Sequence, residues 1–299
     1  MTAVYTPKPE AYAFFHEAQQ LRASGKSKHT RQIADLCKRA VAMDPGYAKA
    51  WALLAVAQTL LGFDSVPGED GREAADKALS LDPNVAEAHA VRARVLIGEG
   101  RAAEAKAEIE KALALNPESY DVNAVAARYF ISTKKYGDAI KHLAKAEKLM
   151  EADVWASGMA LQCHEARGDT AGARMAAQSS MQRINKILAA DPEHGDALCF
   201  GVTTLLRLGQ GAKAQDWADR AMKANPDNRN LAYNMACAMV QLARFDRAIE
   251  LLEPVAEHAS RQGVEWFKVD TDLDPIRKSP RFKALLEKAE ARLGPAKAS

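Results

Sequence analysis

The sequence lacks an excess of charge of either sign. Its 299 residues include 41 lysines and arginines and 39 aspartates and glutamates, and the two signs are mixed along the chain. A protein that attracts nucleic acid or an anionic membrane through its overall field carries a one-signed surface, which this composition does not provide. We therefore expect neither nucleic acid nor a membrane surface as a partner.

Cysteines and long apolar runs are also scarce. The cysteines are widely separated and lie in apolar helical contexts, which is typical of structural thiols in a reducing cytosol and not of a short stapled framework. They are Cys37, Cys163, Cys199 and Cys237. No stretch approaches the roughly 18 to 20 uncharged residues of a membrane span, and the N-terminus has no basic flank leading into an apolar run. We expect a cytoplasmic protein.

What the chain has instead is a phrase repeated along its length. The stretch EKALALNPE, residues 110–118, returns as KRAVAMDPG, DKALSLDPN and DRAMKANPD. Prolines of this series are separated by 38, 34, 75 and 34 residues, which indicates a period of about 34. Apolar residues recur three and four positions apart, as in a helix that packs on one face. The prolines are Pro45, Pro83, Pro117, Pro192 and Pro226, and small residues precede four of them by five positions, at Ala40, Ala78, Ala112 and Ala221.

Each period also contains a turn signal between two helical stretches. Proline ends one helix and can begin the next, so each unit is predicted to be a helical hairpin. A small residue allows the two antiparallel helices of a hairpin to approach closely. The turn signals are Gly62, Gly100, Lys134, Gly168 and Gly209.

A two-helix unit with this period resembles the tetratricopeptide repeat (TPR) family over nearly the whole chain. The residues that carry the resemblance in the second and third units are Trp51, Leu54, Ala55, Gly62, Ala78 and Pro83, and then Ala93, Leu96, Gly100, Ala105, Ala112 and Pro117. The resemblance implies an all-α, right-handed solenoid over residues 1–263, because stacked hairpins bury one another's apolar faces. The seven expected repeats are about 11–45, 46–83, 84–117, 118–151, 152–192, 193–226 and 227–263.

Two segments depart from the regular repeat. The second helix of the fifth unit, from about Thr170 to Ala190, carries seven extra residues and is expected to protrude from the solenoid. Residues 264–299 break the pattern and are expected to form a cap and tail, with Ser279 as helix N-cap, Pro280 as first helical residue and Gly294 as the end. The apolar residues of the cap should cover the last repeat, and they are Trp266, Phe267, Leu273, Ile276, Phe282, Leu285 and Leu286.

The end of the chain carries a narrower resemblance. The stretch YNMACAMVQL followed by VEWFKVDTDLDPIRKSPRFKALL is similar to the closing segment of TPR regions in bacterial class III adenylate cyclases and related signalling proteins. Such similarity implies a sensory or docking module. None of the cyclase catalytic domain is present in this sequence.

The sequence contains partial matches to cofactor and metal motifs, but none has the context that the chemistry requires. The stretches 98–103 and 209–214 match G-x-G-x-x-A, but both follow a helix and lack the strand that a dinucleotide site requires. Cys163 and His164 are adjacent on a helix and point about 100° apart, so they do not make a metal site. No nucleophile with a base is predicted by spacing. We expect no cofactor, no metal and no enzymatic activity.

The TPR resemblance implies a concave groove lined by the first helix of each unit. Within it, Arg94 and Arg128 lie one repeat apart, close enough to hold one acidic side chain between them. The alternative, that these arginines pair with Glu87 and Asp121 as a solvated face, stays open here. The predicted peptide-binding residues of the groove are Arg94, Arg128, Trp155, Gln162, Phe200, Tyr233 and Asn234.

The leading hypothesis is an interaction scaffold that binds a protein or peptide segment in this groove. The second hypothesis is a regulatory TPR module of a cyclase or other signalling enzyme, acting in cis or in trans. A homo-oligomer is compatible with both. The lack of lysines at the second and fifth positions of the first helices argues against the clamp with which chaperone-adaptor TPRs hold a C-terminal carboxylate.

Overall fold

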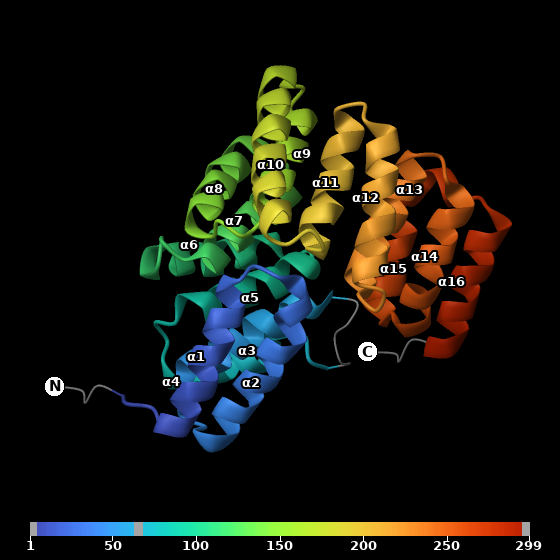
Figure 1. Cartoon of the computed structure of the whole chain (residues 1–299). Coiled ribbons are helices and arrows are strands. Elements are labelled where there is room, and N and C mark those ends of the chain that lie inside the picture. The colour runs from blue at the N-terminus through green and yellow to red at the C-terminus, as the bar shows by residue number, and fades with distance from the viewer. Residues whose placement is uncertain (1–4, 63–67, 295–299) are drawn as a thin grey trace. The chain divides into compact units, whose positions relative to one another are not determined.

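The computed structural model describes residues 5–62 and 68–294, and within these ranges the chain is α-helical with short 3-10 helices and no strand (Figure 1). The helices fall two to each expected repeat range. They are α1 (Pro9–Ala23) and α2 (Thr30–Met43), α3 (Ala48–Leu61) and α4 (Arg72–Leu81), α5 (Ala86–Gly98) and α6 (Ala102–Leu115), α7 (Tyr120–Ser132) and α8 (Tyr136–Leu149), α9 (Trp155–Ala166) and α10 (Thr170–Ala190), α11 (Gly195–Arg207) and α12 (Gly211–Ala224), and α13 (Arg229–Gln241) and α14 (Phe245–His258). The all-α fold class predicted from the sequence is confirmed.

Contacts between residues divide the chain into two compact units. Unit 1 contains residues 5–61 and 68–183 of the described chain, and unit 2 contains residue 62 and residues 184–294. The boundary falls inside α10, so this helix begins in one unit and ends in the other. The division into a solenoid over residues 1–263 and a cap over 264–299 follows the repeat pattern and stays a prediction.

Small residues close the hairpins, as the repeat pattern requires. The alanines that precede the recurring prolines have no exposed surface, and each accepts a backbone hydrogen bond from the residue four positions later, which ends the helix. These alanines are Ala40, Ala78, Ala112 and Ala221. A larger side chain at any of them would push the two helices of the hairpin apart.

The turns inside the hairpins use left-handed backbone. Gly100, between α5 and α6, has a φ of 73°, and nothing lies within 4 Å of the place where a Cβ would be, so glycine is favoured there by backbone conformation alone. Lys134 and Ala243 adopt the same conformation, with φ of 58° and 55°, at the equivalent turns of two other hairpins. The repeat therefore imposes this turn even where the sequence does not supply glycine.

Part of the extension of α10 is packed in a core, while the protrusion expected from its length stays a prediction. Its C-terminal part lies in unit 2, where Ile184 is fully buried and its side chain lies 3.4 Å from the place that a Cβ on Gly201 of α11 would occupy. The ring of Trp217 on α12 packs against the same side of Gly201. The extra residues therefore contribute core to unit 2 because apolar side chains at 184, 187 and 188 continue the packing stripe of the helix.

The C-terminal segment folds onto the last repeat. It consists of α15 (Arg261–Val269), a 3-10 helix (Thr271–Ile276) and α16 (Pro280–Leu293), and this segment contacts α13 and α14. Ser279 is the N-cap residue and Pro280 the first helical residue of α16, and Gly294 ends it with a φ of 66°. The side chains of Phe267, Leu273, Ile276, Phe282 and Leu285 are buried, whereas Trp266 is 51% exposed and does not cover the repeat.

Candidate functional site

The first helices of successive hairpins pack side by side in unit 1. Helix α3 contacts α5, and α5 contacts α7, while each of these helices also contacts the second helix of its own hairpin. Residues at equivalent positions of α3, α5 and α7 therefore share one face, which we call the inner face of unit 1. Arg94 on α5 and Arg128 on α7 occupy equivalent positions one repeat apart.

The guanidinium group of Arg128 lies over an indole ring. Its central carbon is 4.2 Å from the centroid of the Trp155 ring at the start of α9, which is a cation–π contact. Arg128 makes no hydrogen bond or ion pair with any other residue in the described part of the chain. The side chain is half-buried, and its guanidinium nitrogens are not among the solvent-inaccessible atoms that lack a partner in the described chain, so its N–H donors are open to solvent and unused by the protein.

Arg94 is anchored by a single hydrogen bond. Its Nη2 donates to the backbone carbonyl of Thr59 at 3.1 Å, in the last turn of α3. Carbonyl groups in the last turn of a helix lack an intrahelical donor and carry the negative end of the helix dipole, so this contact fixes the direction of the side chain. The bond uses one of the five guanidinium donors and supplies no carboxylate to the cation.

Neither arginine pairs with the acidic residue that the solvated-face alternative assigned to it. Among residues 5–62 and 68–294, no carboxylate lies within 4 Å of Arg94 or Arg128. Asp121 pairs with Arg22 instead, and Glu87 accepts a long hydrogen bond of 3.5 Å from Asn116. The alternative of two solvated ion pairs is therefore wrong for these side chains.

Arg22, at the end of α1, is the participant that sequence reasoning missed. Its Nη2 pairs with the Asp121 carboxylate at the start of α7, and its guanidinium carbon lies 5.1 Å from the Tyr120 ring centroid. Its Nη1 is 3.7 Å from Sδ of Met150, and its Nε is buried without a hydrogen-bond partner in the described chain. We call Arg22, Arg94 and Arg128 the arginine cluster.

The turn after α1 brings Arg22 to this place. Gly25 has a φ of 68°, and a Cβ there would lie 3.0 Å from the backbone carbon and oxygen of Ala152, in the turn before α9. The first repeat thus touches the turn between the fourth and fifth. This contact could not be predicted from a local sequence pattern, because the two segments are separated by more than a hundred residues.

Two carboxylates lie in the same region, and both are engaged. Asp121 is paired with Arg22. Asp153 is 7% exposed and accepts a hydrogen bond of 2.9 Å from the backbone N–H of Ala156, which orders the start of α9 where Trp155 stands. Burial raises the pKa of Asp153 in spite of this hydrogen bond.

Within the cluster, Arg22 has a counter-ion in Asp121, whereas Arg94 and Arg128 have no carboxylate within 4 Å among the described residues. Burial lowers the pKa of Arg94, and the charge of Arg128 lowers it further, because a second cation in a low-dielectric region disfavours the first. Burial also lowers the pKa of Arg128. Three guanidinium groups thus face two carboxylates, of which Asp121 is paired with Arg22 and Asp153 accepts a hydrogen bond from the Ala156 N–H.

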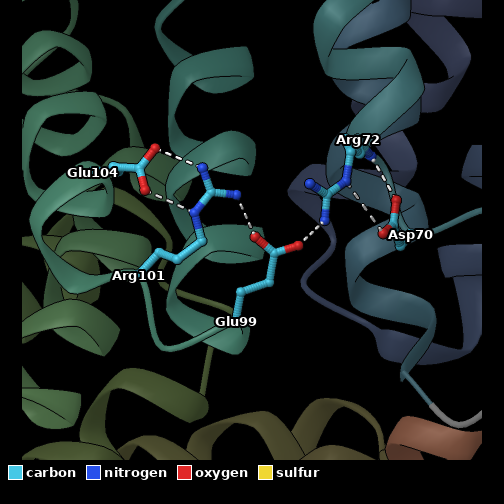
Figure 2. A network of polar contacts seen from close by, with 5 residues as sticks. All are labelled: Asp70, Arg72, Glu99, Arg101 and Glu104. Carbon is cyan, nitrogen blue, oxygen red and sulfur yellow. Dashed lines mark hydrogen bonds and ion pairs between the residues drawn. The ribbon is translucent and has the colours of Figure 1, made fainter. Parts of the chain in front are cut away.

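An exposed charge network elsewhere in unit 1 offers a direct contrast. Figure 2 shows Arg72 and Arg101 joined through the Glu99 carboxylate, with Arg101 held by Glu104 and Arg72 beside Asp70. Arg101 Nε and Nη2 donate to the two oxygens of Glu104 at 2.7 and 2.6 Å, a bidentate pair. Here every guanidinium has a carboxylate, and the carboxylates outnumber the arginines.

The other predicted contact residues are more scattered. Gln162 is exposed on α9, two turns after Trp155. Phe200 and Asn234 lie in unit 2, where Phe200 is half-buried and Asn234 is exposed. The structure thus brings together Arg94, Arg128 and Trp155, and the partner-binding role of the whole set stays a prediction.

Tyr233 is covered by the C-terminal segment. Its ring is 5% exposed and stacks on Phe267 of α15, with centroids 5.3 Å apart and planes 13° from parallel, and its hydroxyl donates to the Asp270 carboxylate. Burial and the neighbouring acidic groups raise the pKa of Tyr233. This side chain connects the last repeat to the cap.

The cysteines and the other potential metal ligands do not form a reactive or metal-binding site in the described residues. All the cysteines are buried, and burial raises the pKa of the Cys37 thiol to about 12 and that of Cys163 to about 11, so they are not activated thiolates. In the described ranges, no three His, Cys, Asp or Glu side chains come together in a way that could hold a metal ion. The same ranges contain no helix with the length and apolar character needed to cross a bilayer.

Comparison with known proteins agrees with this fold. The tetratricopeptide repeat family model matches residues 96–145, which run from the end of α5 into α8. Human IFIT1, solved as a dimer with m7Gppp-AAAA, is 16% identical with a TM-score of 0.64 over 95% of this chain and 69% of its own. The Cut9–Hcn1 hetero-tetramer of the APC/C is 13% identical with a TM-score of 0.61 over 92% of this chain and 55% of its own. No curated protein matches the sequence.

At such low identity, these likenesses concern the fold alone. They place the chain in the class of all-α helical-repeat proteins of the TPR-solenoid type. The tetratricopeptide repeat family is matched directly in residues 96–145. A link to the TPR regions of adenylate cyclases does not follow from these comparisons.

Proposed function

We propose that the chain is a scaffold that binds a segment of a partner protein on the inner face of unit 1. The observation that supports this proposal is the group formed by Arg94, Arg128 and Trp155. The two arginines are half-buried, have no carboxylate partner in the described chain, and lie beside an indole ring. Arginine and tryptophan are the side chains most enriched among interface residues that dominate binding energy. Helical-repeat proteins of this class use such faces for protein binding.

The first test is capture from a lysate of the source organism. The wild-type chain, the Arg94→Glu, Arg128→Glu variant and a control variant with Arg72→Glu, Arg101→Glu are immobilised, and captured proteins are identified by mass spectrometry. The proposal predicts a partner that binds the wild-type and control chains and is lost with the inner-face variant. Equal capture by all three would remove the inner face of unit 1 from consideration. Circular dichroism of the variants checks that their helices are intact.

The second candidate is a regulatory TPR module of an adenylate cyclase or another signalling enzyme, in cis or in trans. Its support is the similarity of the α13 and C-terminal segments to the closing segment of such modules. A purified cyclase from the same organism whose activity changes when this chain is added would favour it. Unchanged cyclase activity across a concentration series of this chain would rule out regulation of that cyclase and would not affect the scaffold proposal.

Binding of an oligonucleotide is a weaker candidate for this chain. Human IFIT1 was solved with m7Gppp-AAAA, but the likeness to it is one of fold. The balanced charge of this chain, with 41 basic and 39 acidic residues, does not favour a polyanion.

A further inference from the structure

The unused donors of the arginine cluster point to a specific ligand chemistry. A guanidinium group presents five N–H donors in a plane and has no acceptor. Arg94 uses one donor, on Thr59, and Arg128 uses none within the described chain. The remaining donors of both arginines are reached by solvent, since Arg22 Nε is the one buried side-chain nitrogen without a partner that the described chain contains, so they are accessible to an acceptor on a ligand.

The net charge of the arginine cluster and its neighbouring carboxylates indicates how much negative charge the ligand carries. Three arginines of the cluster face Asp121 and Asp153, which leaves a single positive charge in excess. One carboxylate neutralises this excess, whereas a phosphate dianion or a nucleic acid backbone exceeds it. The planar guanidinium fork also matches the two oxygens of a carboxylate.

The surroundings favour a carboxylate that is carried by a side chain of a longer segment. Trp155 lies beside Arg128. The other inner-face positions of α5 and α7 near the arginines are apolar but buried, and they are Ala90, Val91, Ala124 and Val125. The apolar surface that a neighbour of the acidic residue could contact is the half-buried ring of Trp155. Binding energy would come from the apolar contacts, and the arginines would select the acidic residue.

From this arrangement we infer that Arg94 and Arg128 form a recognition site for one aspartate or glutamate side chain within the partner segment, with Trp155 holding Arg128 in place. This inference rests on the proposed scaffold function and specifies its ligand. Arg22 does not contact the ligand, because its Nη2 is bound to Asp121 and its Nε is buried. It positions α7 and adds positive charge to the site.

The test uses peptides selected against the full chain. Twelve-residue peptides from a random display library are selected on the wild-type protein and counter-selected on the Arg94→Met, Arg128→Met variant. Each selected peptide is synthesised with every acidic residue changed in turn to its amide, and affinities are measured by fluorescence polarisation. A matched control protein carries Arg72→Met and Arg101→Met in the exposed network.

One acidic residue of the peptide should dominate the result. Its change to the amide is expected to weaken binding to the wild-type and control proteins by about tenfold or more, and to leave the weaker binding to the inner-face variant unchanged. An Arg94→Lys, Arg128→Lys variant should bind between these limits, because lysine keeps the charge and loses the fork. A peptide that owes its affinity to its C-terminal carboxylate would contradict the side-chain assignment, and this is seen by amidating the terminus.

The outcomes separate the two proposals. Peptides that bind the inner face with no loss on amide substitution would refute the carboxylate site and leave the scaffold function standing. Failure to select any peptide that distinguishes the wild-type from the inner-face variant would refute both. Tighter binding of a single-stranded RNA oligonucleotide than of any peptide, with the same dependence on Arg94 and Arg128, would assign the site to nucleic acid instead.

Discussion

Two pairs of arginines in unit 1 have opposite surroundings. Arg72 and Arg101 are 43% and 47% exposed and have three carboxylate partners between them, of which Glu99 contacts both. Arg94 and Arg128 are half-buried with no carboxylate within 4 Å in the described chain. The exposed pair could do without its partners, since water would solvate it, yet it is fully paired. The half-buried pair has no such carboxylate and relies on the Thr59 carbonyl and the Trp155 ring.

Under the proposed function, this difference separates a surface that only carries solvated charge from one that binds a partner. Exposed ion pairs contribute little to folding and cost little to form. Unpaired cations on a half-buried face work against folding, because burial and mutual repulsion both oppose their charge. If these arginines bind a partner, as proposed, the lost stability is offset by the function. Such trade-offs between stability and function are common at binding sites.

The largest expected effect comes from breaking the one ion pair that the cluster contains. Asp121→Asn leaves Arg22 buried without a counter-ion, and we expect a loss of about 2–3 kcal/mol, below the 3–5 kcal/mol of fully buried pairs because this pair is partly exposed. Urea denaturation measures the change. Glu104→Gln, its control in the exposed network, should shift the midpoint much less. Equal losses at the two positions would break the comparison.

The next effect has the opposite sign. Arg94→Met replaces a half-buried cation with an apolar side chain of similar length, and we expect the free protein to gain up to about 1 kcal/mol, because burial of the charge and the repulsion from Arg128 together outweigh the lost bond to Thr59. The measurement is again urea denaturation, with Arg72→Met as control, which should gain nothing. A destabilised Arg94→Met protein would mean that Arg94 is structural.

The pH dependence of stability should differ in sign between the regions. The folded pKa of Asp153 is raised above its ordinary value near 3.8, so its carboxyl contributes stability below that value and the contribution is lost as pH rises through the folded pKa. The folded pKa of Glu99 is lowered by Arg72 and Arg101, so its contribution is present above the ordinary value near 4.5 and is lost as pH falls.

Thermal unfolding between pH 3 and 7 tests this difference. Relative to wild type, Asp153→Asn should become more favourable as pH rises, and Glu99→Gln less favourable. Parallel curves for the two variants would show that the burial of Asp153 does not control its protonation.

Salt should produce the smallest effect and distinguish exposed from buried charges. Raising NaCl shortens the screening length to about 3 Å at 1 M. The small difference between wild type and Glu104→Gln should then vanish, while most of the difference between wild type and Asp121→Asn remains. Loss of both differences in high salt would place the Arg22–Asp121 pair in contact with solvent.

Much of the site could be predicted because the repeat fixes registers. Arg94 and Arg128 follow from counting one period along equivalent helices, and Trp155 follows from the next unit. Their lack of carboxylate partners could not be predicted, since Glu87 and Asp121 are near in sequence and only the fold directs Asp121 to Arg22. Likewise, nothing local indicates that Tyr233 is covered by the C-terminal segment.

The sequence by itself determined the helices, their turns and the hairpin pairing. These depend on interactions between residues a few positions apart and on small side chains at fixed places, which periodicity records. The tertiary structure decided which charges meet and which remain unpaired. Arg22 reaches Asp121 only because the turn at Gly25 lies against Ala152, and contacts between segments so far apart in the chain depend on how every intervening hairpin packs on the next.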